Sequence, residues 1–375
     1  MDSCLRYARH KQKDIIALIR EFVECESPSD HPPSINRFVD LLSARVHDIA
    51  KVKKFPGGHL RVEFTLPGNM KNGQILALGH SDTAWSLGTL KSMPFLERKG
   101  RLWGPGVLDM KGGLAFFIFA MRALRELEVP VSRKVVMQVN ADEEVGSESS
   151  RAFTEEAARA SNAVLVLEPG TGLEGKLKTA RKGVGDYVIT VRGRASHAGL
   201  DFEKGANAIV EMARQLERIA GFTQLDRGVT VSPGVIHGGT RSNVVPAECR
   251  AEVDIRAPRD RDRLYLEKKF MSLKAFDKRC TVEVTGGLNR PPMERSAGIG
   301  KLYKTAQKLA AELGVVLEES SVGGGSDGNF TAALGVPTLD GLGAVGEGAH
   351  ASHESILISR IADRTALLAK LVAAL

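Results

Sequence analysis

Cysteine is scarce in this chain of 375 residues, and the four present are scattered as Cys4, Cys25, Cys249 and Cys280. No two of them form a Cys-x-x-Cys pair. Metal sites and redox motifs built from paired thiols are therefore not expected. The pattern favours ordinary reduced thiols in a cytoplasmic protein.

Long apolar runs are also missing. The longest, residues 114–120, is far too short to span a bilayer. The first twenty residues mix charges throughout and lack an apolar segment, so a signal peptide is not expected. We therefore expect no membrane association.

Basic residues do not gather with aromatic ones. The chain has 52 Lys and Arg against 45 Asp and Glu, a net charge of +7, but the charges are interspersed and only 5% of residues are aromatic. Nucleic-acid binding is therefore not expected, whereas a mildly positive field would favour small acidic substrates. What is abundant is hydrophobic content, 43% of the chain, which indicates a globular protein with a substantial core. The length favours two domains.

Three continuous apolar runs each end in an acidic or imidazole side chain. Residues 74–79 lead to His80, residues 134–139 to Asp142-Glu143-Glu144, and residues 163–167 to Glu168. An apolar helix over residues 113–127 is predicted after the first run, and such alternation is typical of a parallel α/β sheet. Ligands of these sheets bind beyond the carboxyl ends of the strands, so we expect these polar side chains to lie together.

The pattern changes near residue 178. Strands are predicted at 187–193, 229–234, 247–255 and 280–284, with helices at 205–220 and 261–275; the order β-α-β-β-α-β is that of a ferredoxin-like α+β unit. From residue 290 the first pattern returns, with a helix at 299–313, strands at 315–318 and 336–339, and a closing helix at 357–374. The sequence therefore predicts an α/β/α domain with a largely parallel sheet, made of residues 1–177 and 290–375, and an inserted domain of residues 178–289.

Six side chains at these loops and strand ends are candidates for metal chemistry: His80, Asp109, Glu143, Glu144, Glu168 and His353. Imidazole and carboxylate without thiolate suit zinc or a similar ion at a catalytic site. Asp109 lies in the glycine-rich stretch 104–113 and could be a simple helix cap, but its two oxygens could also bridge two metals.

Neighbouring side chains at a strand end can point in different directions. One glutamate of the pair Glu143-Glu144 could therefore bind metal while the other accepts a proton from water. Asp82, two residues beyond His80, is placed to hold the other ring nitrogen of that histidine. Of His350 and His353 only one need bind metal; we predict His353, with His350 structural.

These segments resemble a known motif series. Residues 80–83, 106–113, 142–146 and 168–169, with His353, look like the dinuclear zinc family of carboxypeptidase G (glutamate carboxypeptidase), acetylornithine deacetylase and succinyl-diaminopimelate desuccinylase. The resemblance implies two Zn²⁺ per subunit, with Co²⁺ or Mn²⁺ as possible replacements. One ion would be held by His80, Asp109 and Glu168, and the other by Asp109, Glu144 and His353. It also implies Glu143 as general base and a cis peptide after Asp109.

The inserted domain shares the resemblance, which implies that it serves as a lid and homodimer contact. In residues 196–199, His197 would reach a site, often that of the partner subunit, to stabilise an oxyanion. In residues 238–246, Asn243 would contact substrate. Arg256 would bind a substrate carboxylate, a bidentate task suited to guanidinium. Gly325, in the glycine-rich segment 323–329, would offer backbone N–H groups to a carboxylate.

The reaction expected from the resemblance is hydrolysis of an amide next to a carboxylate-bearing amino acid. Trp85 and residues 88–95 look closest to the carboxypeptidase G branch, which predicts release of a C-terminal glutamate-like residue from a peptidyl or N-acyl group. The alternative is a deacylase of small N-acyl amino acids with the same catalytic groups. A metal-binding scaffold without chemistry is a third reading, against which the intact Glu143 argues.

Overall fold

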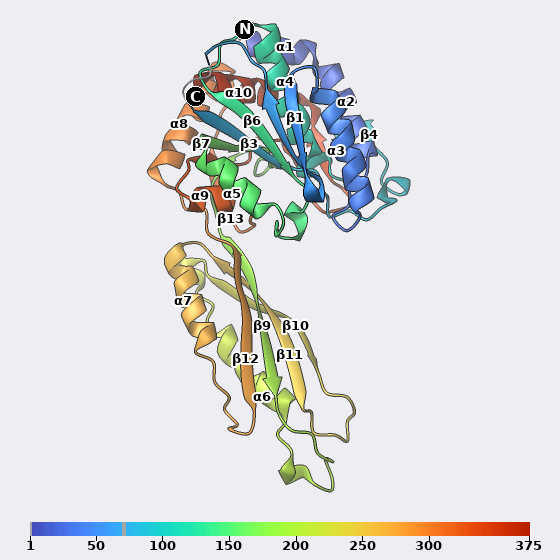
Figure 1. Cartoon of the computed structure of the whole chain (residues 1–375), viewed down its shortest axis with the longest axis vertical. Coiled ribbons are helices and arrows are strands. Elements are labelled where there is room, and N and C mark those ends of the chain that lie inside the picture. Colours follow the sequence, from blue (N-terminus) through green and yellow to red (C-terminus); the bar gives the residue numbers. More distant parts are fainter. Residues whose placement is uncertain (1, 70–72) are drawn as a thin grey trace. The chain divides into compact units, whose positions relative to one another are not determined.

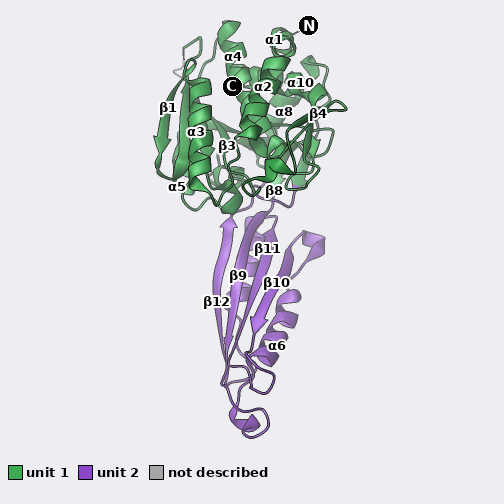
Figure 2. Cartoon of the chain, turned by 90° about the vertical axis from the view of Figure 1, so that its right-hand side faces the viewer, with its two compact units in different colours: residues 1–180, 295–321, 326–375 green, residues 181–294, 322–325 purple. Residues whose placement is uncertain are grey.

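The computed structural model describes residues 2–69 and 73–375 (Figure 1). Contacts divide the chain into two compact units (Figure 2). The larger comprises residues 1–180, 295–321 and 326–375, and the smaller comprises residues 181–294 and 322–325. The short segment 322–325 thus groups with the smaller unit, which the division at residues 178 and 289 did not anticipate.

A six-stranded sheet forms the centre of the larger unit, in the order β1-β2-β6-β3-β7-β14. β3 is parallel to β6 and β7, and β14 is parallel to β7, whereas β2 is antiparallel to both of its neighbours. The mostly parallel sheet is confirmed. The strand bounds are β1 Ala50–Phe55, β2 His59–Phe64, β3 Gln74–His80, β6 Lys134–Asn140, β7 Ser161–Val166 and β14 Thr338–Leu339.

Helices cover both faces of this sheet, which explains the continuous apolar runs. Along β3, Ile75 and Ala77 join one core cluster, while Leu76 and Leu78 join the cluster on the opposite face. α5 (Arg151–Arg159) and α9 (Gly328–Ala333) lie on the second face. The larger cluster on the first face is built with α1 (Ser3–His10), α2 (Gln12–Glu24), α3 (Pro32–Val46), α4 (Gly112–Glu126), α8 (Ala297–Glu312) and α10 (Ile361–Ala374).

A smaller four-stranded sheet in the same unit, ordered β15-β16-β5-β4, brings two loops together. β16 is antiparallel to β5, with Ser355 opposite Trp103. The first residues of the loop that leaves β5 therefore lie beside the last residues of the loop that enters β16. The bounds are β4 Leu96–Arg98, β5 Arg101–Trp103, β15 Gly346–Glu347 and β16 Ser355–Leu357.

The strand predicted at residues 315–318 is wrong. The strand there is β13 (Glu319–Val322), which pairs with β8 (Leu177–Arg181). The apolar residues before it hydrogen-bond to α8 instead: the Val315 N–H donates to the Ala310 carbonyl at 2.9 Å, and the Leu317 carbonyl accepts from the Tyr303 hydroxyl at 3.0 Å.

The smaller unit is an antiparallel sheet, ordered β10-β11-β9-β12, with two helices packed on one face. Its strands are β9 (Gly183–Arg192), β10 (Thr230–Gly238), β11 (Glu248–Ala257) and β12 (Thr281–Arg290), and its helices are α6 (Ala208–Ala220) and α7 (Asp260–Met271). Alternate β9 residues Tyr187, Ile189 and Val191 enter the core beneath these helices, and β10 is an edge strand. The predicted α+β unit is confirmed. Across the described residues of both units, no helix has the length and apolar character of a membrane span.

Candidate metal centre

The parallel strands of the larger unit place the candidate side chains at one edge of the sheet. His80 is the last residue of β3 and lies opposite Asn140, the last residue of β6. The turn with Glu143 and Glu144 follows β6, and Glu168 follows the parallel strand β7. A common edge for these residues is what the strand pattern predicted.

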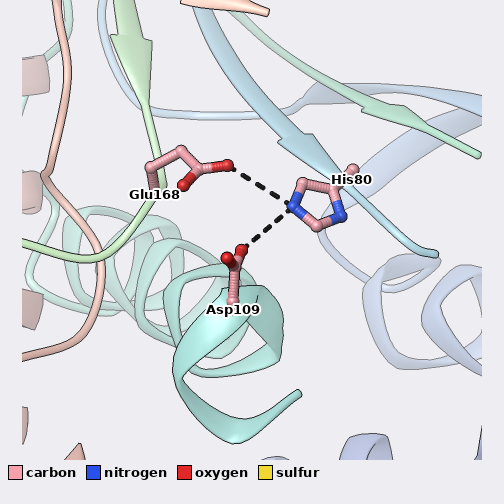
Figure 3. A group of neighbouring side chains, drawn as sticks. All are labelled: His80, Asp109 and Glu168. Atoms are coloured by element: carbon pink, nitrogen blue, oxygen red, sulfur yellow. Dashed lines mark hydrogen bonds and ion pairs between the residues drawn. The ribbon is translucent and has the colours of Figure 1, made fainter. Parts of the chain in front are cut away.

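The first group of possible ligands consists of His80, Asp109 and Glu168 (Figure 3). His80 Nε2 lies 3.2 Å from Asp109 Oδ1 and 3.4 Å from Glu168 Oε1. The imidazole is 1% exposed, and its Nδ1 lies 2.9 Å from the Asp82 carbonyl and 3.4 Å from the Asp82 carboxylate. Contacts at Nδ1 orient the ring so that Nε2 faces the two other side chains.

The second group consists of Asp109, Glu144 and His350. His350 Nε2 lies 3.1 Å from Glu144 Oε1 and 3.5 Å from Asp109 Oδ2. Asp109 thus offers one oxygen to each group, which is the arrangement of a carboxylate that bridges two metal ions.

The second group contains His350 rather than His353, the histidine predicted from sequence. Both histidines lie in the hairpin loop between β15 and β16, but His353 is exposed and its ring lies against Gly348. Gly348 and His350 have positive φ values of 83° and 59°, so the loop turns sharply between β15 and His350. The position of the ring depends on this turn, which the spacing of the two histidines does not encode.

Asp82 connects the two groups. Its Oδ1 and Oδ2 accept the backbone N–H groups of Glu143 and Glu144, each at 3.1 Å, and its Oδ2 also accepts from the Ser29 hydroxyl at 2.8 Å. The carboxylate that lies beside the His80 ring therefore also fixes the turn that carries Glu143 and Glu144. Ser29 did not stand out in the sequence.

The histidines and carboxylates of the site shift one another's pKa values. Burial would lower the pKa of His80, but Asp109, Asp82 and Glu168 together raise that pKa well above its usual value. Burial would raise the pKa of Asp109, but His350 and His80 hold it well below its usual range.

Asp109 and Glu144 raise the pKa of His350 to about 11. The negative charge of the carboxylates therefore sets the pKa values of both histidines. The atoms that could bind a metal are imidazole nitrogens and carboxylate oxygens, with no thiolate. Such a set fits two divalent ions of the zinc type.

The loop that carries Asp109 requires its glycine. Gly106 has φ of 74°, and a side chain there would come within 2.8 Å of Thr83. The peptide after Asp109 is cis, as the family resemblance implied. Glu354, buried just before β16, accepts hydrogen bonds from this loop. Glu354 did not stand out in the sequence, since a single glutamate near two histidines carries no distinctive pattern.

The remaining candidates belong to the smaller unit. The exposed His197 accepts the N–H groups of Gly199 and Leu200 at Nδ1, each at 3.1 Å, which leaves Nε2 as the donor of a neutral ring. The Asn243 carbonyl accepts from Ala198 N–H at 3.0 Å, so Asn243 lies beside this segment.

Arg256 and Gly325 are held by other groups of the smaller unit. The Arg256 guanidinium forms a bidentate contact with Asp254, at 3.0 and 2.7 Å. The Gly325 carbonyl accepts from the buried Arg181 guanidinium at 3.0 Å.

His197 and Arg256 lie toward opposite ends of the smaller unit's sheet. Arg256 is opposite Val184, near the start of β9, whereas Gly193, just after the end of β9, bonds to Ala247. Nine residues of extended chain between positions 247 and 256 span about 30 Å. The two side chains therefore cannot meet at one point of a single unit.

Known proteins resemble this chain in sequence and in fold. The profile of "Peptidase family M20/M25/M40" matches residues 76–374. Carboxypeptidase G2 of Pseudomonas sp. (strain RS-16) is 29% identical over 97% of this chain and 90% of that protein. Acetylornithine deacetylase of Klebsiella pneumoniae (strain 342) is 30% identical over 58% of this chain and 60% of that protein. The crystal structure of aminopeptidase PepT from Bacillus cereus ATCC 10987 superposes with a TM-score of 0.80 at 21% identity, covering 96% of this chain and 98% of that one.

Proposed function

The chain belongs to peptidase family M20/M25/M40, and from this premise we propose that it releases a C-terminal glutamate-like amino acid from a peptidyl or N-acyl group. Its reaction class is that of a metal-dependent peptidase or amidohydrolase. The observation that carries the proposal is the pair of ligand groups that share Asp109. The likeness to carboxypeptidase G2 over almost the whole chain supports the glutamate-like specificity.

Two Zn²⁺ ions, replaceable by Co²⁺ or Mn²⁺, are proposed for the two groups. His80, Asp109 and Glu168 would hold one ion, and Asp109, Glu144 and His350 the other. Such ions lower the pKa of water toward neutrality and polarise a carbonyl oxygen. In this proposal Glu143 accepts the proton of the attacking water and passes it to the leaving amine. Asp82 holds the turn that carries Glu143 and keeps the His80 ring in place.

Groups of the smaller unit would recognise substrate. Arg256 is proposed to bind the substrate carboxylate, and its contact with Asp254 would be exchanged for this carboxylate. Backbone N–H groups around Gly325 and the side chain of Asn243 are proposed as further substrate contacts. His197, with Nε2–H as donor, would stabilise the oxyanion.

A homodimer through the smaller unit is part of the proposal. Arg256 lies at the sheet end where β9 begins and β12 ends, and His197 lies near the other end, so a second copy would supply His197. The edge strand β10 exposes Val235 and Ile236, and α6 exposes Ile209 and Val210. These apolar side chains are the proposed contact.

Replacing Ile236 by Asp should give monomers in sedimentation velocity and lower kcat about a hundredfold, as loss of an oxyanion donor would. An unchanged dimer would contradict this contact.

The substrate is tested with a matched panel. Peptidyl- and N-acyl-glutamates are compared with N-acetylornithine and N-succinyl-diaminopimelate, each assayed with Zn²⁺, Co²⁺ and Mn²⁺. We expect the glutamate compounds to have the highest kcat/KM. Turnover of only the latter two compounds would favour the deacylase alternative, which the likeness to acetylornithine deacetylase supports.

The role of Glu143 is tested by Glu143→Gln. The variant should keep its metal content but lose about 10²–10⁴ in kcat, since a general base contributes that much. Glu148→Gln, in the exposed part of the same loop, is the matched control and should have wild-type activity. Equal activity of both variants would exclude Glu143 as the base, and a wild-type protein that binds metal without hydrolysing any amide would favour a scaffold.

A further inference from the structure

The Glu354 carboxylate accepts four hydrogen bonds close to the two possible ligand groups, one of them from the Asp109 backbone. Its Oε1 accepts the N–H groups of Leu108 and Asp109 at 2.8 and 3.1 Å. Its Oε2 accepts the Gly106 N–H at 2.9 Å and the Trp85 indole N–H at 2.8 Å. The residue is fully buried. Four N–H donors surround the carboxylate, and each oxygen accepts two of them.

The contacts tie together three loops: two carry the proposed ligands Asp109 and His350, and the third follows the proposed ligand His80. Gly106, Leu108 and Asp109 belong to the loop that leaves β5 and presents the shared carboxylate. Trp85 lies in the loop that follows His80. Glu354 itself ends the hairpin loop of His350, four residues after that histidine, and its carbonyl accepts the Gly104 N–H at 3.4 Å.

We propose that Glu354 is a positioning residue that fixes the Asp109 backbone against the His350 loop and thereby sets the metal affinity of the second group. The inference rests on the proposed dinuclear site. As a positioning residue, Glu354 would touch neither the substrate nor the reacting atoms. It would act through Asp109 and His350.

The second group should depend on this anchor more than the first. His80 ends a central strand and Glu168 follows another, so two of the three ligands of the first group are set by the sheet. Glu144 lies in a short turn and His350 in the hairpin loop, so the second group relies on contacts between loops. When Asp109 shifts, the first group keeps two ligands in place, whereas the second loses the alignment of Asp109 with His350.

The experiment is a Co²⁺ titration of the metal-stripped full chain, followed by visible absorption and metal analysis. In Glu354→Gln, the amide presents one oxygen and one NH₂ group to four N–H donors, so two donors lose their acceptor. The first ion should bind within about threefold of wild type, and the second at least about tenfold more weakly, as for loss of other residues that orient ligands. Restoring kcat at high Co²⁺ would agree with a positioning role.

Glu26→Gln is the matched control. Glu26 also accepts two backbone N–H groups of a loop, those of Gly88 and Leu90 at 2.9 and 3.0 Å, but none from residues 104–111. Both ions should bind this variant as they bind wild type.

Wild-type affinity for both ions in Glu354→Gln, or equal weakening of both, would overturn the inference. A wild-type chain that binds fewer than two ions would instead refute the proposed function. If Glu354→Gln does not fold, Trp85→Phe removes only one of the four donors and should weaken the second ion alone by about twofold to fivefold; unchanged binding there would equally overturn the inference.

Discussion

The two metal-capable groups share one carboxylate but are built in different ways. The first is made from the ends of β3 and β7, and its histidine is 1% exposed. The second is made from a turn and a hairpin loop, and its histidine is 50% exposed. Sheet hydrogen bonds fix the first, whereas the second depends on side chains that connect loops, chiefly Asp82 and Glu354.

This difference has a functional consequence. A rigid, buried group should hold its ion tightly, and a group on loops should exchange its ion more readily. The two ions are therefore expected to be unequal, with the first bound more tightly. Equal affinities of the two ions in a Co²⁺ titration would contradict the expected difference between the buried group and the loop group.

The largest effect is expected where the groups overlap. Asp109→Ala removes one ligand from each group, so metal content should fall below one ion per chain and activity should drop by at least about 10³-fold, since both ions serve the reaction. Asp226→Asn, an exposed carboxylate of the smaller unit, is the control. A chain without Asp109 that still binds two ions would show that the groups do not share a bridge.

A smaller, selective effect is expected for the hairpin loop. His350→Ala should lose the second ion and keep the first, which metal analysis and Co²⁺ spectra would show, with a large fall in kcat. His353→Ala should bind both ions as wild type does, because that ring faces Gly348 rather than the site. The opposite result would restore the prediction made from sequence.

The same comparison shows how far sequence reasoning reaches. The edge with His80, Glu144 and Glu168 was predictable because each follows a buried strand, and parallel strands bring their carboxyl ends together. His350 was not, because its position depends on the backbone turn at Gly348 and His350 rather than on any periodic pattern. Glu354 escaped notice because its four partners are N–H groups, three of them from the backbone.

The strand predicted at residues 315–318 failed for a related reason. A short apolar run there satisfies a strand pattern, but Val315 and Leu317 are hydrogen-bonded to residues of α8 rather than to another strand. Contacts with the preceding helix therefore overrode the local strand pattern.

The smallest expected effect is a difference of one proton between wild type and His350→Ala in the number of protons released when metal binds. In the metal-free protein the pKa of His350 is raised to about 11 and that of His80 lies well above its usual value, so both imidazoles are protonated at neutral pH. A metal ion binds only the neutral ring, so loading should release about two protons in wild type and His353→Ala, and about one in His350→Ala.

The sign of the pH dependence follows from these pKa directions. Metal affinity should rise with pH, and the proton released by His350 should persist from pH 7 to 9, because a pKa of about 11 keeps the free ring charged there. A ring with an ordinary pKa of about 6.5 would release almost none above pH 8. Calorimetric titrations in buffers of different ionisation enthalpy count these protons. A His350-dependent release that fades above pH 8 would mean that Asp109 and Glu144 do not hold this histidine charged.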